Sequence, residues 1–148
     1  MHRSISFDLE APQEFPQYLA LCAQIFNRYA EWFHCNKKKN SPELTSLYYN
    51  LRKEFSEIPS AVVQALRDSA WESCQRVKFK FLPRKKPTSS LRYTARAISW
   101  KGNRLTLAYK IGEKRLSYFL PLPKFFRERY DGWKFQAGII GWNKKKVV

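Results

Sequence analysis

The chain has 148 residues, of which 28 are lysine or arginine and 12 are aspartate or glutamate, and its formal net charge is +16. Hydrophobic residues make up 44% of the sequence, which excludes a disordered tail. A positive excess of this size attracts phosphate polymers or an anionic membrane. The sequence offers no signal peptide, no basic amphipathic helix and no long apolar stretch for a membrane. The composition therefore favours nucleic acid as the partner.

The soft metal ligands are few and badly spaced. The three cysteines, Cys22, Cys35 and Cys74, form no CxxC pair, and the only histidines are His2 and His34. We therefore predict no metal site and no cofactor. Cys22 and Cys74 are better interpreted as small core residues of helices. Free cysteines weakly indicate a reducing, cytoplasmic location.

The positive charge is concentrated in the second half of the chain. Residues 1–75 carry 8 lysines and arginines against 9 acidic residues, a net −1. Residues 76–148 carry 20 against 3, a net +17. A charge step this steep indicates a dedicated binding surface.

The first half predicts helices after a short alternating strand. The first helix opens near Pro12 and ends at the polar run of residues 36–40, because its apolar residues recur at spacings of three and four. A second helix is expected after Ser41, whose side chain can cap it, with a proline at the first helical position. A third runs from about residue 58 to Val77.

The second half predicts short strands. Lysine and phenylalanine alternate in residues 78–81, and further runs cover residues 92–100, 105–109, 116–120 and 135–142. Such runs predict a meander or a small barrel. The expected fold class is therefore α+β.

One face of the third predicted helix carries polar and aromatic residues. Ser60, Gln64, Arg67 and Trp71 follow each other at spacings of four, three and four, so they share the side opposite the apolar stripe. Glutamine and arginine can make two-pronged hydrogen bonds to base edges, which predicts a DNA-binding face. The alternative is that Trp71 packs on the strands while Gln64 and Arg67 are merely solvated.

Two basic stretches follow this helix. The first interleaves cations with Phe79 and Phe81, a mixture that suits phosphate neutralisation with base stacking. Its cations are Lys78, Lys80, Arg84, Lys85 and Lys86. The second begins a predicted strand with Arg92, Tyr93 and Arg96, which we also assign to RNA or phosphate binding. The alternatives are a solvated edge strand for the first stretch and cross-strand packing for the second.

The sequence predicts no catalytic centre. A two-metal nuclease needs several carboxylates that converge on the ions. The basic half offers only Glu113, Glu128 and Asp131, in no recognisable pattern. We therefore expect that residues 1–148 contain no active site and that this chain is not itself an enzyme.

Several segments, in order along the chain, resemble one family. Residues 47–52 (LYYNLR) and 58–68 (IPSAVVQALRD) are similar to the helical motifs of TnpB, the OrfB-type protein of insertion sequences and a relative of type V CRISPR effectors. Residues 90–105 resemble its basic strand segment. Residues 130–134 (YDGWK) resemble the stretch that leads towards its RuvC-like nuclease domain, which would begin after Val148.

The resemblance implies a wedge-type, oligonucleotide-binding β-barrel that is interrupted after its first strand by a recognition bundle of three to four helices. Residues 1–10 and 78–148 would form the wedge, and residues 11–77 the bundle. It implies a recognition module that binds guide RNA and a short duplex DNA motif beside the target, in the cytoplasm of a prokaryotic-type cell. By position, Ser60 and Gln64 would face the DNA, and the basic strand residues would hold RNA. The nuclease domain would be absent or supplied in trans.

Two other functions remain open at this point. A stand-alone DNA-binding regulator, in which the helices act as a helix-turn-helix, would explain a chain without nuclease carboxylates. A structural RNA-binding protein would explain the composition alone.

Overall fold

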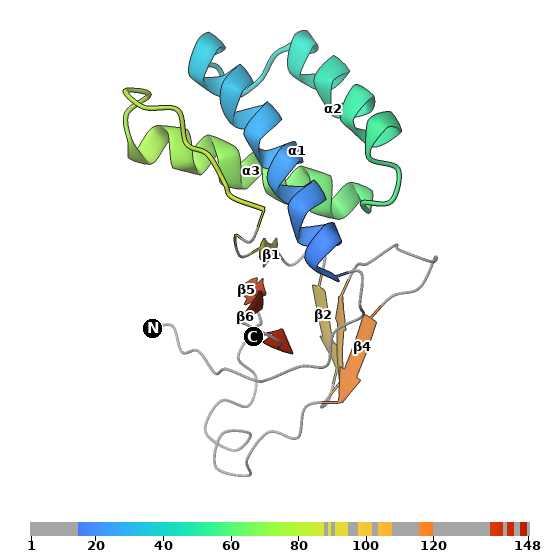
Figure 1. Ribbon diagram of the computed structural model, residues 1–148. Helices are drawn as coiled ribbons and strands as arrows, with labels where there is room; N and C mark the ends of the chain where they lie inside the picture. Colours follow the sequence, from blue (N-terminus) through green and yellow to red (C-terminus); the bar gives the residue numbers. More distant parts are fainter. Residues whose placement is uncertain are drawn as a thin grey trace.

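The computed structural model describes residues 15–87, Ser89 and seven short strands between residues 91 and 147, with side chains for residues 15–87 and Ser89. The described residues form three helices followed by the strands. The helices lie together on one side and the β2–β3–β4 sheet lies beyond one end of α1 (Figure 1). None of the described helices is long and apolar enough to cross a membrane.

Helix α1 spans Phe15–Asn36 and confirms the first predicted helix. Its apolar residues at spacings of three and four form one wide stripe, and the whole stripe is buried. The helix ends where Lys37 takes a left-handed backbone with φ 55° and donates its amide hydrogen to the Phe33 carbonyl at 2.8 Å. The polar run after Asn36 therefore stops the helix as expected.

Helix α2 spans Pro42–Glu54 and begins with the predicted cap. The Ser41 Oγ accepts hydrogen bonds from the amides of Glu43 at 3.1 Å and Leu44 at 3.4 Å. The Ser41 hydroxyl also donates to the Glu43 carboxylate, and this bond lowers the pKa of Glu43. The helix buries only Leu44 and Leu51, so it covers the edge of the core.

Helix α3 spans Ser60–Arg76 and crosses α1 (Figure 1). It has no side-chain cap, and instead the Pro59 carbonyl accepts the amides of Val62 at 3.0 Å and Val63 at 3.1 Å. The start and end lie within two residues of the predicted helix. Its buried stripe faces α1, and its remaining residues are half-buried or exposed.

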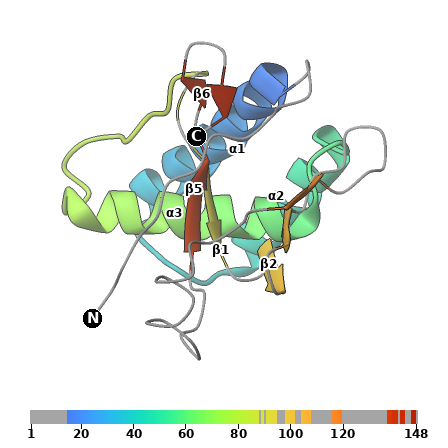
Figure 2. The same cartoon turned by 90° about the horizontal axis from the view of Figure 1, so that it is seen from below.

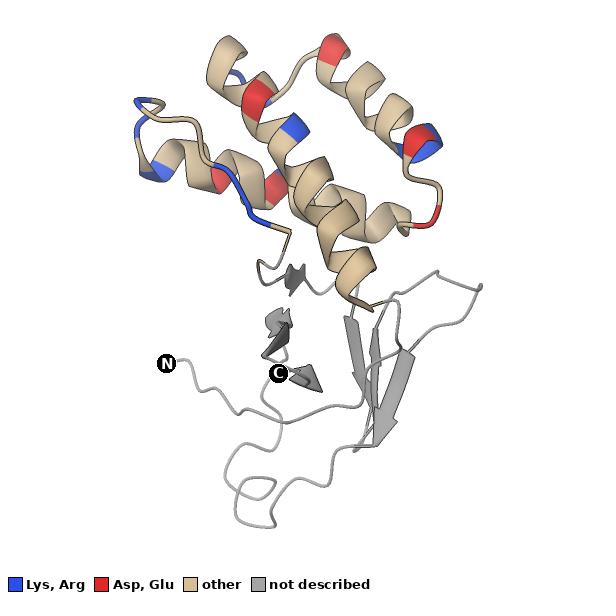
Figure 3. Ribbon diagram, viewed as in Figure 1, with Lys and Arg blue, Asp and Glu red and all other residues tan. Residues whose placement is uncertain are grey.

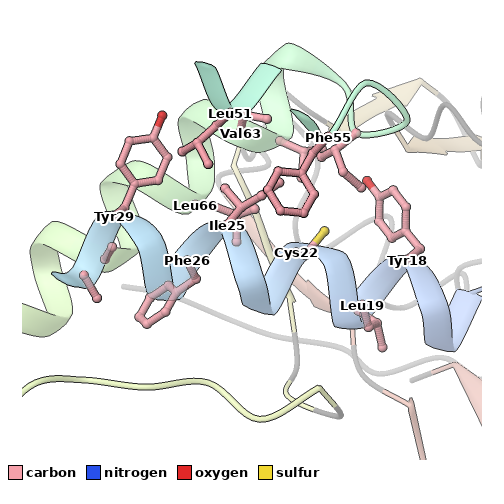
Figure 4. Packing of buried hydrophobic residues seen from close by; sticks show 14 of the residues in the cluster. Tyr18, Leu19, Cys22, Ile25, Phe26, Tyr29, Leu51, Phe55, Val63 and Leu66 are labelled. Atoms are coloured by element: carbon pink, nitrogen blue, oxygen red, sulfur yellow. The ribbon is translucent and has the colours of Figure 1, made fainter. Parts of the chain in front are cut away.

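The core lies between α1 and α3, and α2 closes it from one side. Figure 4 shows Ile25 and Cys22 of α1 facing Leu66 and Val63 of α3, with Leu51 above them. Cys22 and Cys74 are both buried, which confirms their interpretation as core residues. In the part of the chain whose side chains are described, the core therefore comes mainly from the helices, with Phe55 and Ile58 added by the turn between α2 and α3.

The strands are short and form three separate antiparallel sheets. Strand β1 (Leu91–Thr94) pairs with β5 (Ala137–Ile140), in the register Leu91 to Ile140. A three-stranded sheet has the order β2 (Ile98–Lys101), β3 (Arg104–Leu107) and β4 (Leu116–Phe119). The last pair is β6 (Trp142–Asn143) with β7 (Lys146–Val147). Strand β1 lies beside α3 (Figure 2).

The prediction of an α+β fold with a small β-barrel is wrong. The part of the chain whose side-chain packing is described, residues 15–87, is helical. The described strands that follow it are only two to four residues long. A barrel requires every strand to pair on both sides, whereas β3 alone among the described strands has two partners. The findings therefore point to an all-helical fold for the packed unit. The predicted first strand, residues 1–10, lies outside the described residues, and the division into domains at residue 77 stays a prediction.

The predicted strand at residues 78–81 is also wrong. Lys78 and Phe79 have φ values of 53° and 56°, which lie in the left-handed region and are incompatible with a strand. The Phe79 amide donates to the Cys74 carbonyl at 2.9 Å, so these residues close the end of α3 instead. An alternation of lysine and phenylalanine over only four residues is too short to distinguish a strand from a turn at the end of a helix.

Candidate nucleic-acid interface

The residues that follow α3 turn back along α1 and form what we call the return segment, residues 77–87 (Figure 1). Two side chains of α1 hold it. The Asn27 amide group donates to the Lys85 carbonyl at 3.0 Å and accepts from the Lys85 amide at 2.7 Å. One turn further along α1, Glu31 pairs with Arg84 at 3.0 Å. The segment is thus fixed to the helix over its second half.

The beginning of the return segment is fixed to α3. Phe79 is half-buried, and its ring centroid lies 5.5 Å from that of Trp71. Trp71 in turn packs edge-on against Phe33 of α1, at 5.2 Å. This row of three rings connects the return segment to the core.

The return segment carries positive charge in two places, at Lys78 and Lys80 and again at residues 84–86. Arg76 and the five cations that follow it up to residue 87 are accompanied by no acidic residue. Lys78, Lys80 and Lys86 are exposed, and Figure 3 shows the cations on the segment that runs beside the helices. The exposed ammonium groups are therefore spread along the segment, where each can neutralise a phosphate.

Lys85 differs from its neighbours. It is half-buried, and its Nζ lies 4.9 Å from the ring centroid of Phe26, a cation–π contact. The Phe26 side chain points towards the return segment (Figure 4). Burial lowers the pKa of the Lys85 ammonium group, and the neighbouring Cys22 partly offsets this. Lys85 therefore helps to seat the segment on α1.

The outer face of α3 consists of Ser60, Gln64, Arg67 and Trp71, all half-buried. The Gln64 Nε2 donates to the Tyr48 hydroxyl of α2 at 3.3 Å. The Arg67 guanidinium group pairs with Asp68 at 3.4 Å. The structure thus brings these residues onto one face, as the helical spacing predicts, and engages three of them within the protein.

Trp71 packs within the protein, as the alternative interpretation of the sequence expected, but its partners are not the strands. It contacts Phe33 and Phe79 of the helical unit, whereas the sequence suggested packing on the strands. The indole ring is only partly exposed. Because it lies between Phe33 of the core and Phe79, it positions the beginning of the return segment. Arg67 and Gln64 keep polar atoms near the surface.

Helix α2 contributes residues that the sequence analysis missed. Tyr49 is 55% exposed, and its ring lies 5.3 Å from that of Tyr48. The Arg52 Cζ lies 5.8 Å from the Tyr48 ring centroid. Because Tyr48 also binds Gln64, these side chains extend the α3 outer face onto α2. The two consecutive tyrosines in residues 47–52 were the sequence signal that could have indicated these surface side chains.

The remaining predicted site residues lie beyond the described side chains. Arg92 and Tyr93 belong to β1, where they pair with Ile139 and Gly138. Arg96 lies outside the described residues, as do Glu113, Glu128 and Asp131. Within the part that the structure describes, no group of three histidine, cysteine or acidic side chains could hold a metal ion.

The chain matches no protein-family model, and no curated protein matches its sequence.

Proposed function

We propose that this chain is the nucleic-acid recognition module of a transposon-encoded RNA-guided DNA nuclease of the TnpB (OrfB) type. The observation that carries the proposal is the return segment, which contains five cations and no acidic residue of its own, exposes Lys78, Lys80 and Lys86, and is held on α1 by Asn27 and Glu31. Phosphate neutralisation needs this arrangement. The resemblance of residues 47–52 and 58–68 supports the more specific family.

The two surfaces take different parts in this proposal. The return segment, with Arg92, Tyr93 and Arg96 beyond it, holds the phosphates of guide RNA. The outer face of α3 contacts a short DNA motif beside the target through Ser60 and Gln64. A nuclease domain, outside these residues or on another chain, cuts the DNA. The complex forms in the cytoplasm of a prokaryotic-type cell.

Binding to a preferred and a scrambled duplex over a range of salt concentrations tests this division. Gln64→Ala should weaken binding to the preferred duplex alone, by about 1–3 kcal/mol, because a two-pronged base contact is lost. Lys78→Ala with Lys80→Ala should weaken binding of RNA of every sequence, measured in the same salt series, and reduce its salt slope by about two. The matched control is Lys37→Ala with Lys38→Ala, which removes the same charge from an exposed run at the end of α1.

Equal effects of the two lysine pairs would show that only net charge matters and would refute a defined interface. The nucleic acid that co-purifies with the chain decides among the functions. One enriched structured RNA supports the proposal. A single duplex motif would support a DNA-binding regulator instead, and ribosomal RNA a structural RNA-binding protein.

A further inference from the structure

Two phenylalanines of the return segment, two positions apart, have opposite surroundings. Phe79 is packed against the helical core, where it contacts Trp71. Leu82 is packed against the same core. Phe81 lies between them in the sequence and is 69% exposed, the most exposed large hydrophobic residue in the part that the structure describes. Its ring therefore contributes little to the packing of the helices.

The chemical surroundings of Phe81 indicate which partner covers it. Lys78 and Lys80 precede it and are exposed, and the segment contains no acidic residue, whereas Arg84 after it already pairs with Glu31 of α1. An apolar protein surface would have to bury these charges beside the ring, which costs free energy without acidic partners. Single-stranded nucleic acid matches both properties, because each nucleotide offers a flat base for the ring and a phosphate for the cations.

We propose that Phe81 is a stacking site for an unpaired base of single-stranded nucleic acid, with Lys78 and Lys80 on the adjoining phosphates. This inference rests on the proposed function and names the form of nucleic acid that the return segment takes. A duplex cannot use the site, because its bases already stack on each other and present only their edges.

The fixed backbone around Phe81 favours stacking. The Phe79 amide bonds to the Cys74 carbonyl on one side, and the Lys85 backbone bonds to Asn27 on the other. The ring is therefore presented from a segment that is held at both ends. Less conformational freedom is lost on binding than from a free loop.

The test measures binding of the full chain to a short single-stranded oligonucleotide of mixed sequence and to its duplex. The oligonucleotide carries one fluorescent base analogue whose emission is quenched by stacking. Phe81→Ala should weaken single-strand binding by about 5- to 150-fold at an unchanged salt slope, as expected for the loss of one stacked base. It should abolish the quenching and leave duplex binding unchanged.

Two further variants separate stacking from simple hydrophobicity. Phe81→Trp should retain affinity and quenching, whereas Phe81→Leu, which is apolar without a π face, should behave like Phe81→Ala. An unchanged thermal midpoint in all three shows that folding is not the cause. If Phe81→Ala or Phe81→Leu bound like the native chain, the stacking site would be refuted. In that case the proposed function would still stand if the double variant, Lys78→Ala with Lys80→Ala, showed a smaller salt slope than the native chain. Binding of neither oligonucleotide by the native chain would overturn both.

Discussion

The return segment and the outer face of α3 both combine cationic with aromatic side chains, but they differ in how far these side chains are exposed. On α3, Gln64 donates to Tyr48 and Arg67 pairs with Asp68, so the polar atoms already have partners within the protein. On the return segment, Lys78, Lys80 and Phe81 extend into solvent. The half-buried residues of the segment, such as Phe79, Leu82 and Lys85, are interspersed with these exposed ones.

The difference shows how backbone form sets the role of a side chain. A helix with a wide buried stripe brings its flanking residues into contact with neighbouring helices, so their geometry is fixed and suits selective contacts. A non-helical segment held at a few points leaves mobile point charges, which suit phosphates of any sequence. Three changes break or sharpen this comparison.

The largest effect is expected from Leu66→Ala, which acts on both surfaces. Leu66 is buried on the inner side of α3 and anchors the helix that carries the outer face and leads into the return segment. The cavity should lower the free energy of unfolding by about 2–5 kcal/mol. Denaturant unfolding followed by circular dichroism measures it. Gln75→Ala, at an exposed position of the same helix, should change the free energy by less than about 0.5 kcal/mol. Equal stability of the two variants would contradict the described core.

Asn27→Ala should release the return segment and leave α3 in place. It removes two hydrogen bonds to the Lys85 backbone, each worth about 0.5–1.5 kcal/mol, so the loss should be about 1–3 kcal/mol. Hydrogen exchange at the Lys85 amide should accelerate, while Gln64-dependent sequence preference stays the same. Asn36→Ala is the control, because the Asn36 side chain donates to the Trp32 carbonyl of its own helix, away from the return segment. An unchanged exchange rate at Lys85 would show that Asn27 does not hold the segment.

The smallest effect is a pH dependence at Cys22, which is buried in the core. Burial raises the pKa of the Cys22 thiol above its ordinary value of 9.0, and the nearby Lys85 lowers it in part. Above pH 9 the unfolded chain therefore loses this proton while the folded chain keeps it, so stability falls as pH rises. The stability of the native chain relative to Cys22→Ala should fall by at most about 1.4 kcal/mol per pH unit. Cys35→Ala, at an exposed cysteine, should run parallel to the native chain; a parallel Cys22→Ala curve would mean that the thiol is accessible to water.

The helices and much of their buried surface could be predicted from the sequence. The apolar spacing of α1, the serine cap of α2 and the polar run after Asn36 are all local signals, and the structure confirms each of them. The shared face of Gln64, Arg67 and Trp71 follows from helical geometry in the same way. The predicted β-barrel is wrong because strand pairing depends on residues far apart in the sequence, which alternation alone does not reveal, and the described strands form separate sheets.

By itself, the sequence determined where the helices begin and end and where the positive charge lies, because periodicity, capping and composition act within a few residues. Only the tertiary structure decided that Phe79 packs inside and Phe81 outside, and that Lys85 rests on Phe26 while Lys80 is free to meet a ligand. Asn27 and Lys85 are 58 positions apart, and no local pattern pairs them. Which cations face solvent depends on how the segment after α3 folds back on α1, and that depends on contacts between distant parts of the chain.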